Sequence, residues 1–296
     1  MGQLYSSLHA VLAYLDDTDP EAAAVARTRY GCLTPWAGDP SAYGRAVLAG
    51  RYRECETDVV HTLRDLLRSR LDGDAASERR YFEAERNARL VANAERYYRI
   101  MYYGSRASWN LRDEHMFDTL LALLRHHGED ARAVVWEHNS HIGDASATEM
   151  GAKGEHNVGQ LAREHFRGDA YLVGFGTHGG TVAAAHDWGE PMMVMRVRPS
   201  LEGSYERLFH ESEMDAFLLP LRHPREVELR NGLLQERLER AIGVIYRPET
   251  ELASHYIHAS LARQFDEYVW FDQSRAVRPL LRAPGRAPGE TFPFGV

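Results

Sequence analysis

The sequence lacks the features that mark membrane, secreted and disulfide-rich proteins. Its 296 residues contain only two cysteines, Cys32 and Cys55, which is too few for a disulfide scaffold and favours reduced thiols. No apolar run approaches the roughly 18 residues that a membrane helix needs. The N-terminus shows neither the positive region nor the cleavage site of a signal peptide. We therefore expect a cytoplasmic protein with no membrane partner.

Several catalytic and binding signatures are also missing. A formal net charge of -8 gives little support for a nucleic-acid partner. The sequence has no GxSxG elbow and no P-loop, and its GxGxxG match, Gly174–Gly179, begins inside an expected strand rather than after one. Neither cysteine has the histidine-rich surroundings that suggest a thiol nucleophile. These absences disfavour serine hydrolases of the α/β-hydrolase type, phosphate-loop and dinucleotide enzymes, and thiol enzymes.

What is present is an ordinary globular composition whose first half is patterned as helices. The chain is 44% hydrophobic and 26% charged, and it is long enough to bury a sizeable core. Apolar residues recur at helical spacing in five stretches, which begin near Ser6 and after Pro20 and cover about 54–71, 77–104 and 110–127. The fourth stretch could be an amphipathic hairpin packed on a sheet, or a lid over it. Asn110 and Asp113 are typical of a helix N-cap and its third-position acid.

The second half alternates between short apolar strands and helices. We expect strands at 133–136, 171–175, 192–197, 216–219, 241–246 and 268–271, and helices at 157–166 and 204–210. This order predicts an α/β fold with a mainly parallel sheet flanked by helices and a long helical hairpin in the first half. We expect one domain over 1–282, with its helical part at about 54–128 as lid or insertion. The tail over 283–296 should be disordered or loosely docked.

The strongest candidate site lies in Val134–His141, where an apolar run turns abruptly polar. In an open α/β sheet, the region just beyond the carboxyl end of a strand is where ligands usually bind. A neutral imidazole of His138 or His141 could take a proton from water. The pair could also hold a metal ion, with Glu137, His178 or Asp144 as a third ligand. A third interpretation is that both histidines only cap and cross-link a loop.

Other polar segments also follow expected strands. In Thr177–Thr181, glycine N–H groups could stabilise an oxyanion, or the segment could be a tight turn. Arg112 could pair with a carboxylate in the site, although a structural role is favoured. The segment Arg247–Thr250 follows a third expected strand and could contribute if the strand order brings it beside His138.

Separate blocks of this sequence resemble the erythromycin esterase family, in the family's order and over nearly the whole chain up to about residue 280. They are Ser108–Met116, Val134–Gly143, Ala147–Gly151, Asn157–Leu161, Gly203–His210 and Ala241–Thr250. The family's HNxH block matches His138, Asn139 and His141, and its RDxxM block matches Arg112, Asp113 and Met116. The resemblance implies an α/β fold and metal-independent ester hydrolysis. It also implies a histidine that activates water against a macrolide lactone, a reaction of antibiotic resistance.

Two parts of the family pattern are not found. The GExxHG segment, which carries a glutamate and a histidine, is absent. The segment Met1–Ser6 stands where the family has GxDxYS, with Gln3 in place of the acid. Glu137 stands where the family more often has a small residue. The resemblance therefore implies an N-terminally truncated member.

The resemblance leads to two expectations. The first is an ester or lactone hydrolase without metal or cofactor. Its residues would be catalytic His138, His141, Glu137 and Arg112, and substrate-binding Asn139, Asp113, Thr177, His178 and Arg247. The second is a truncated or degenerate, inactive member that acts as a binding protein or needs a partner chain. In that case a second copy, making a homo-oligomer, could cover the sheet edge left open by missing strands.

Overall fold

The structure, a computed structural model, describes residues 4–69, 75–187, 189–222 and 227–278. These residues divide into two compact units, the first ending at His115 and the second beginning at Met116. The expectation of one domain over 1–282, with a lid or insertion at about 54–128, stays a prediction. The tail over 283–296 lies outside the described residues.

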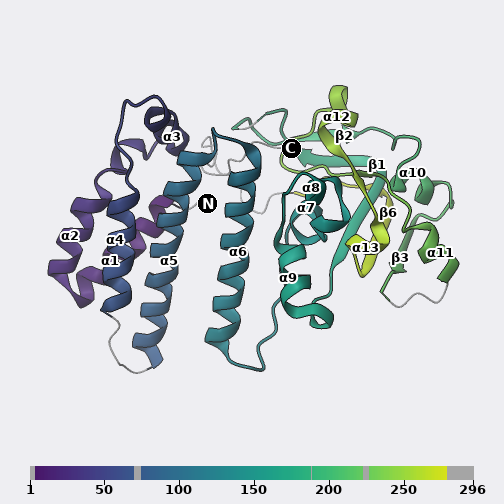
Figure 1. The fold of residues 1–296 in the computed structure, drawn as a ribbon. Coiled ribbons are helices and arrows are strands. Elements are labelled where there is room, and N and C mark those ends of the chain that lie inside the picture. Colours follow the sequence, from purple (N-terminus) through teal and green to yellow (C-terminus); the bar gives the residue numbers. More distant parts are fainter. Residues whose placement is uncertain (1–3, 70–74, 188, 223–226, 279–296) are drawn as a thin grey trace. The chain divides into compact units, whose positions relative to one another are not determined.

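The first unit is a set of helices around one apolar core (Figure 1). Its elements are α1 (Leu4–Thr18), α2 (Pro20–Tyr30), α3 (Pro40–Leu48), α4 (Glu56–Arg68), α5 (Ala75–Ile100) and the first half of α6 (Ser105–His127). Asp19 and Asp39 cap α2 and α3 by accepting hydrogen bonds from backbone N–H groups, and a proline follows each cap at the first helical position. The long helix α5 packs against α1, α3 and α4.

Several helix predictions are confirmed and others need correction. The stretch expected at 77–104 is one helix, α5, but it ends at Ile100, and the helical hairpin of this half is formed by α4 and α5, which pack on each other. Helix α3 was not predicted. Helix α6 begins at Ser105, so Asn110 and Asp113 lie inside it and the prediction that they cap it is wrong.

The prediction of reduced cysteines is also wrong. Cys32 and Cys55 are joined by a disulfide bond, with their Cα atoms 6.0 Å apart. Both are buried in the helical core, beside Tyr43 and Tyr52, whose hydroxyls bond the Cys55 N–H and the Cys32 carbonyl. Sequence spacing alone did not show that the two side chains meet.

The second unit is built on a four-stranded sheet with the order β2-β1-β6-β3. The strands are β1 (Val173–Ala184), β2 (Met193–Val197), β3 (Ala216–Pro220) and β6 (Glu267–Ser274). Strands β1 and β6 are parallel, whereas β2 and β3 run antiparallel to their neighbours. The α/β class is therefore confirmed, but this sheet is mixed rather than mainly parallel. A separate antiparallel pair joins β4 (Arg237–Arg240) to β5 (Tyr256–Ala259).

Short helices complete the second unit. They are α7 (Asn139–Ile142), α8 (Glu149–Ala152), α9 (Val158–Phe166), α10 (Tyr205–His210), α11 (Val227–Gly232), α12 (Glu251–His255) and α13 (Leu261–Gln264). The expected cap of α9 is confirmed, because the Asn157 side chain accepts a hydrogen bond from the Gln160 N–H. No helix among the described residues is long and apolar enough to cross a membrane.

The two faces of the sheet differ in burial. On one face, Tyr268 and Trp270 of β6 are fully buried against Phe209 of α10. The opposite face carries large apolar side chains that remain exposed, namely Phe175, Val194, Leu218 and Phe271. Because side chains alternate along a strand, these residues share the face that turns away from the core.

Two expected strands are not strands. Residues 133–136 belong to no helix or strand and form no backbone hydrogen bond with any described residue, so they join no sheet. Residues 241–246 form irregular structure that includes one isolated bridge, between Ile245 and Ala185. Conversely, the glycine-rich Thr177–Thr181, expected as a loop or turn, continues inside β1.

Candidate functional site

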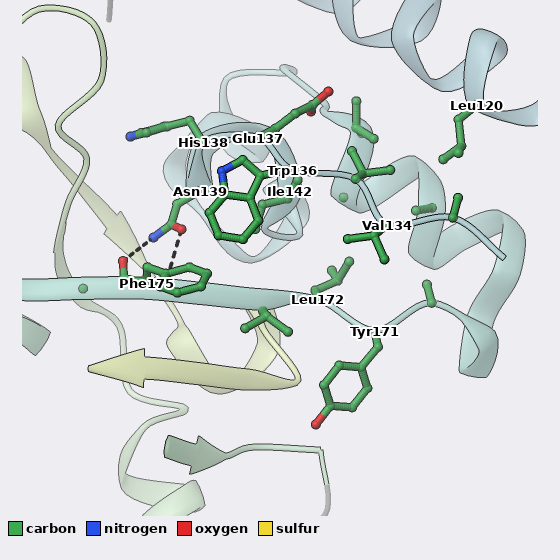
Figure 2. Close-up of a pocket in the computed structure, with 18 of the residues that line it drawn as sticks. Leu120, Val134, Trp136, Glu137, His138, Asn139, Ile142, Tyr171, Leu172 and Phe175 are labelled. Atoms are coloured by element: carbon green, nitrogen blue, oxygen red, sulfur yellow. Dashed lines mark hydrogen bonds between the residues drawn. The ribbon is translucent and has the colours of Figure 1, made fainter. Parts of the chain in front are cut away.

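A cavity of about 1860 Å³ lies in the second unit beside the 131–138 segment. Apolar side chains form much of its wall, including Val134, Trp136, Leu172 and Phe175 (Figure 2). The ring of Trp136 lies toward β1, with its centroid 5.8 Å from that of Phe175. The same cavity is lined by polar side chains, among them His138 and Asn139. It thus combines a wide apolar surface with a few polar groups, as ligand sites do.

His138 is held in one neutral form by its neighbours. It is the N-cap of α7, and its Nδ1 accepts a hydrogen bond from the Ser140 N–H at 3.2 Å. Nε2 therefore carries the hydrogen and donates it to the Ile242 carbonyl at 2.9 Å. Burial, and next the nearby His141, lowers the pKa of His138 to about 4. The ring is consequently uncharged at neutral pH.

Asn139 ties this segment to the sheet. Its amide nitrogen donates to the Phe175 carbonyl at 2.7 Å, and its amide oxygen accepts from the Phe175 N–H at 3.1 Å (Figure 2). The same side chain also acts to lower the pKa of the nearby Glu239 carboxyl group. These hydrogen bonds hold Asn139 in the cavity wall, and the substrate contact expected for it stays a prediction.

Two buried glutamates beside Asn139 were not predicted from the sequence. Glu206 of α10 lines the cavity and Glu239 of β4 lies near it, and each has one carboxyl oxygen with no hydrogen-bond partner among the described residues. Burial, and then the neighbouring Glu206, raises the pKa of Glu239 to about 8. Burial also raises the pKa of Glu206. The carboxyl group of Glu239 therefore holds its proton at neutral pH.

Arg240 links the same region to β1. Its side chain is buried and forms an ion pair with buried Glu251, at 3.1 Å between Nη1 and Oε1. Its Nη2 donates to the carbonyls of Thr177 and His178 at 2.6 and 2.7 Å, and Nη1 donates to the Arg198 carbonyl. A single guanidinium thus fixes the middle of β1, which is part of the cavity wall.

Helix α7 is held against α9 by a close backbone approach. The Asn157 amide nitrogen donates to the carbonyls of Ser140 and Gly143, both at 2.7 Å. A Cβ atom at Gly159 would lie only 2.2 Å from the Ile142 carbonyl oxygen. Glycine at this position therefore lets the turn that carries His138 pack directly on α9.

The variant Gly159→Ala should be less stable than the wild type by about 1–3 kcal/mol, because the added methyl group must push two backbone segments apart. This reverses the usual preference of helices for alanine over glycine, which is about 1 kcal/mol. Thermal unfolding of both proteins measures the difference. Gly232→Ala is the control, since a Cβ atom in that helix meets nothing within 4 Å. Equal effects at the two positions would contradict the close-packing explanation.

The expected residues of β1 lie on opposite sides of the sheet. Thr177 lines the cavity. His178 points the other way and does not line it; its Nδ1 lies 2.7 Å from the Ser200 hydroxyl oxygen. The His178 ring stacks on His210 at 3.5 Å, and His210 in turn contacts Asp272. The alternation of side chains along a strand separates the two neighbours.

The remaining expected residues are spread over the chain. Glu137 lines the cavity and His141 lies on α7, three residues after His138. Arg247 does not line the cavity, and its guanidinium pairs with Asp187. Arg112 and Asp113 belong to the first unit, where the Arg112 guanidinium lies over the Trp109 ring. Functional roles for all five residues stay predictions.

The metal-binding alternative finds no cluster to support it in the part of the chain that the structure describes. There, no group of three or more histidine, cysteine, aspartate or glutamate side chains is arranged to hold a metal ion. Asp144, considered as a third ligand, instead accepts from Ser146 and pairs with Arg163.

Solved structures share this fold over most of the chain. A succinoglycan biosynthesis protein aligns with 92% of this chain at 17% identity and a TM-score of 0.70. A protein from Bacillus cereus aligns with 91% at 15% identity and a TM-score of 0.72. An erythromycin esterase mutant in its open conformation aligns with 91% at 14% identity and a TM-score of 0.61. This chain covers only 62%, 64% and 65% of those three chains, respectively.

A sequence model of one family also matches. The model described as erythromycin esterase covers residues 1–274, which is most of the 296 residues and includes both described units up to the end of β6. It includes the HNSH segment, the buried glutamates and the strands that surround the cavity. The chain therefore belongs to the erythromycin esterase family.

Proposed function

We propose that this chain hydrolyses a carboxylic ester or lactone in the cavity beside His138. Membership of the erythromycin esterase family carries the proposal, because it favours a hydrolase. The cavity adds the local support, since a mostly apolar wall meets a neutral imidazole and a buried acid there. A macrolide lactone is the first substrate class to test, because the name of the family points to it.

The proposed step needs one base and one acid. Neutral His138 has its lone pair on Nδ1, which lies 2.9 Å from the Ser140 hydroxyl oxygen. A water molecule that replaced this contact would pass a proton to Nδ1 while its oxygen bonds the acyl carbon. The acyl–oxygen bond then breaks, and the leaving alkoxide takes the proton from Nδ1, so that His138 acts first as the base and then as the acid and returns to its neutral form. His141 and Glu137 would orient the water and the ring, and Thr177 would contact the substrate.

Binding without hydrolysis is the second candidate function. One observation favours it: both ring nitrogens of His138 are already hydrogen-bonded, to Ser140 and to Ile242. A base needs one of these contacts to open. If none opens, the cavity would still take an apolar ester without cleaving it.

The variant His138→Gln should lower kcat by about 10²–10⁴, the usual contribution of a general base. Wild-type kcat should stay flat from pH 9 to about pH 5 and fall below that, because the pKa of His138 is lowered to about 4 and the base is lost only when the ring protonates. Initial rates on a panel of macrolides and aryl esters test both statements.

The control for this experiment is His258→Gln, which changes an exposed histidine of β5. It should leave kcat unchanged. Equal turnover by His138→Gln and the wild type would remove His138 from the mechanism. Tight binding of the same esters with no product from the wild type would favour the binding function.

A further inference from the structure

The Ile242 carbonyl is the contact that stays with the His138 ring during the proposed step. The Nε2–H group of His138 donates to it at 2.9 Å, and both residues line the cavity. In that step water takes the place of Ser140 at Nδ1, so the bond to Ile242 is what then orients the ring. A histidine base is usually oriented by a third group in this way. In this site the third group is a backbone carbonyl.

A carbonyl can orient a ring only if its own stretch of chain is fixed. Strand β4 ends at Arg240, so its ladder with β5 stops two residues before Ile242. One backbone bond continues on the β5 side, from the Ala241 N–H to the His255 carbonyl at 2.8 Å. The Arg240 N–H is on the opposite edge, away from β5, and it also needs an acceptor because it is buried.

Glu206 provides that acceptor. The Arg240 N–H donates to Glu206 Oε1 at 2.8 Å. Glu206 is the second residue of α10, and its side chain is only 1% exposed. An isolated bridge between Ser204 and Leu238 brings the start of α10 alongside this edge of β4. The segment 240–242 is therefore held from both edges, by His255 on one side and by Glu206 on the other.

The residues of this connection lie in one wall of the cavity. Glu206, Arg240, Ile242 and His138 all line it, and all belong to the second unit. The connection consists of two hydrogen bonds, one at each end of three consecutive residues. A displacement of the Arg240 peptide group is thus passed along a short piece of backbone to the atom that orients the base.

We propose that Glu206 is a positioning residue for His138, acting through the backbone of residues 240–242. Without its carboxyl group, the Arg240 N–H would be buried with no acceptor, and the segment would shift to find one. The ring could then turn its hydrogen to the Ser140 hydroxyl oxygen, which lies 2.9 Å from Nδ1. Nδ1 would lose the lone pair that has to accept the proton of water. The catalytic effect rests on the proposed hydrolysis, whereas the position of the ring does not.

Two substitutions at Glu206 separate the acceptor from the charge. Glu206→Met has a side chain of similar length without an acceptor, and it should lower kcat by about 10²-fold, the effect of a small misplacement of a reacting group. KM should change little, because the apolar wall is intact. Glu206→Gln keeps a carbonyl oxygen in the place of Oε1 and should recover most of the lost kcat. Glu211→Met is the matched control, at an exposed residue that caps the other end of α10.

The ring hydrogen of His138 gives a second measurement, which needs no substrate. NMR of protein labelled with ¹⁵N at histidine should show an Nε2–H signal that Ile242 protects from exchange with water. The spectrum of His138→Gln lacks this signal and thereby assigns it. Glu206→Gln and Glu211→Met should retain it. In Glu206→Met it should be lost to exchange or be joined by a signal from Nδ1–H.

A Glu206→Met protein with the kcat of the wild type, or with an unchanged His138 signal, would overturn the proposal. Equal losses in Glu206→Met and Glu206→Gln would also overturn it, because the carboxyl group would then act directly. If circular dichroism shows that Glu206→Met does not fold, Glu206→Asp replaces it, since its shorter side chain does not reach the Arg240 N–H. A wild type without hydrolysis that still shows the NMR differences would refute the hydrolysis and support the positioning.

Discussion

Replacing Arg240 by methionine should lower the free energy of unfolding of the second unit by about 3–5 kcal/mol, the range found when one partner of a buried ion pair is removed. The variant would leave the buried carboxyl group of Glu251 without its guanidinium partner, and among the described residues only the Tyr246 hydroxyl would still donate to it. It would also leave the carbonyls of Thr177, His178 and Arg198 without the guanidinium donor. Hydrogen exchange of peptides from β1 and β6 in increasing urea reports the stability of this unit.

Arg247→Met provides the comparison, because Arg247 also pairs with an acid but does so in solvent. An exposed pair of this kind contributes at most about 1 kcal/mol. We therefore expect a several-fold difference between the two variants. A loss below about 1 kcal/mol for Arg240→Met would mean that water replaces the guanidinium and that this buried network does not hold the strand.

The variant Glu239→Gln should become progressively more stable than the wild type as the pH rises. In the folded protein the pKa of Glu239 is raised from its ordinary value of 4.5 to about 8, mainly by burial. Between these two values the unfolded chain has released the proton and the folded chain still holds it. The wild type thus loses about 1.4 kcal/mol of stability per pH unit in that window, and glutamine, which does not titrate, removes the loss. The full difference is on the order of 4–5 kcal/mol.

Urea unfolding of the wild type and Glu239→Gln at intervals from pH 4.5 to pH 8.5 measures this slope. Glu236→Gln is the control, because Glu236 lies three residues before Glu239 and is exposed. Its replacement should leave the dependence of the unfolding free energy on pH as it is in the wild type. Parallel stability curves for the wild type and Glu239→Gln would show that the carboxyl group ionises normally in the folded state. The expected result would instead place a neutral acid beside the cavity at pH 7.

Local patterns predicted the helices better than the strands. Pro20 marked the start of α2, and Asn157 with Gln160 marked the start of α9, because these signals act within one helical turn. The start of α6 was missed since the polar Asn110 lies inside a helix that had already begun at Ser105. The signals at the starts of α2 and α9 do not depend on the rest of the fold.

Strand predictions failed where pairing decides the structure. The run Val134–Trp136 has the composition of a buried strand, but a strand also needs partners for its backbone groups, and none of the described residues supplies them. Conversely, β1 continues through the glycine-rich Thr177–Thr181 because β2 and β6 pair with it there. Composition cannot report pairing between residues that are far apart in the sequence.

The candidate site was predicted only in part. The sequence drew attention to His138 and Asn139, and both line the cavity. It could not show that the His138 ring donates to Ile242, which lies 104 residues later in the chain. Glu206 and Glu239 were missed for the same reason: a glutamate in a sequence looks solvated, and only tertiary packing makes these two buried.

The pair of hydrogen bonds from Asn139 to Phe175 has one more consequence. A side-chain amide has the same donor and acceptor geometry as a peptide group, so Asn139 completes the ladder at this point of β1 as one residue of a neighbouring strand would. The beginning of α7 and the edge of β1 are thereby coupled. Any movement that draws the HNSH turn away from the sheet also exposes the peptide groups of Phe175 to water. Opening of the cavity wall and fraying of the strand edge would then be a single event.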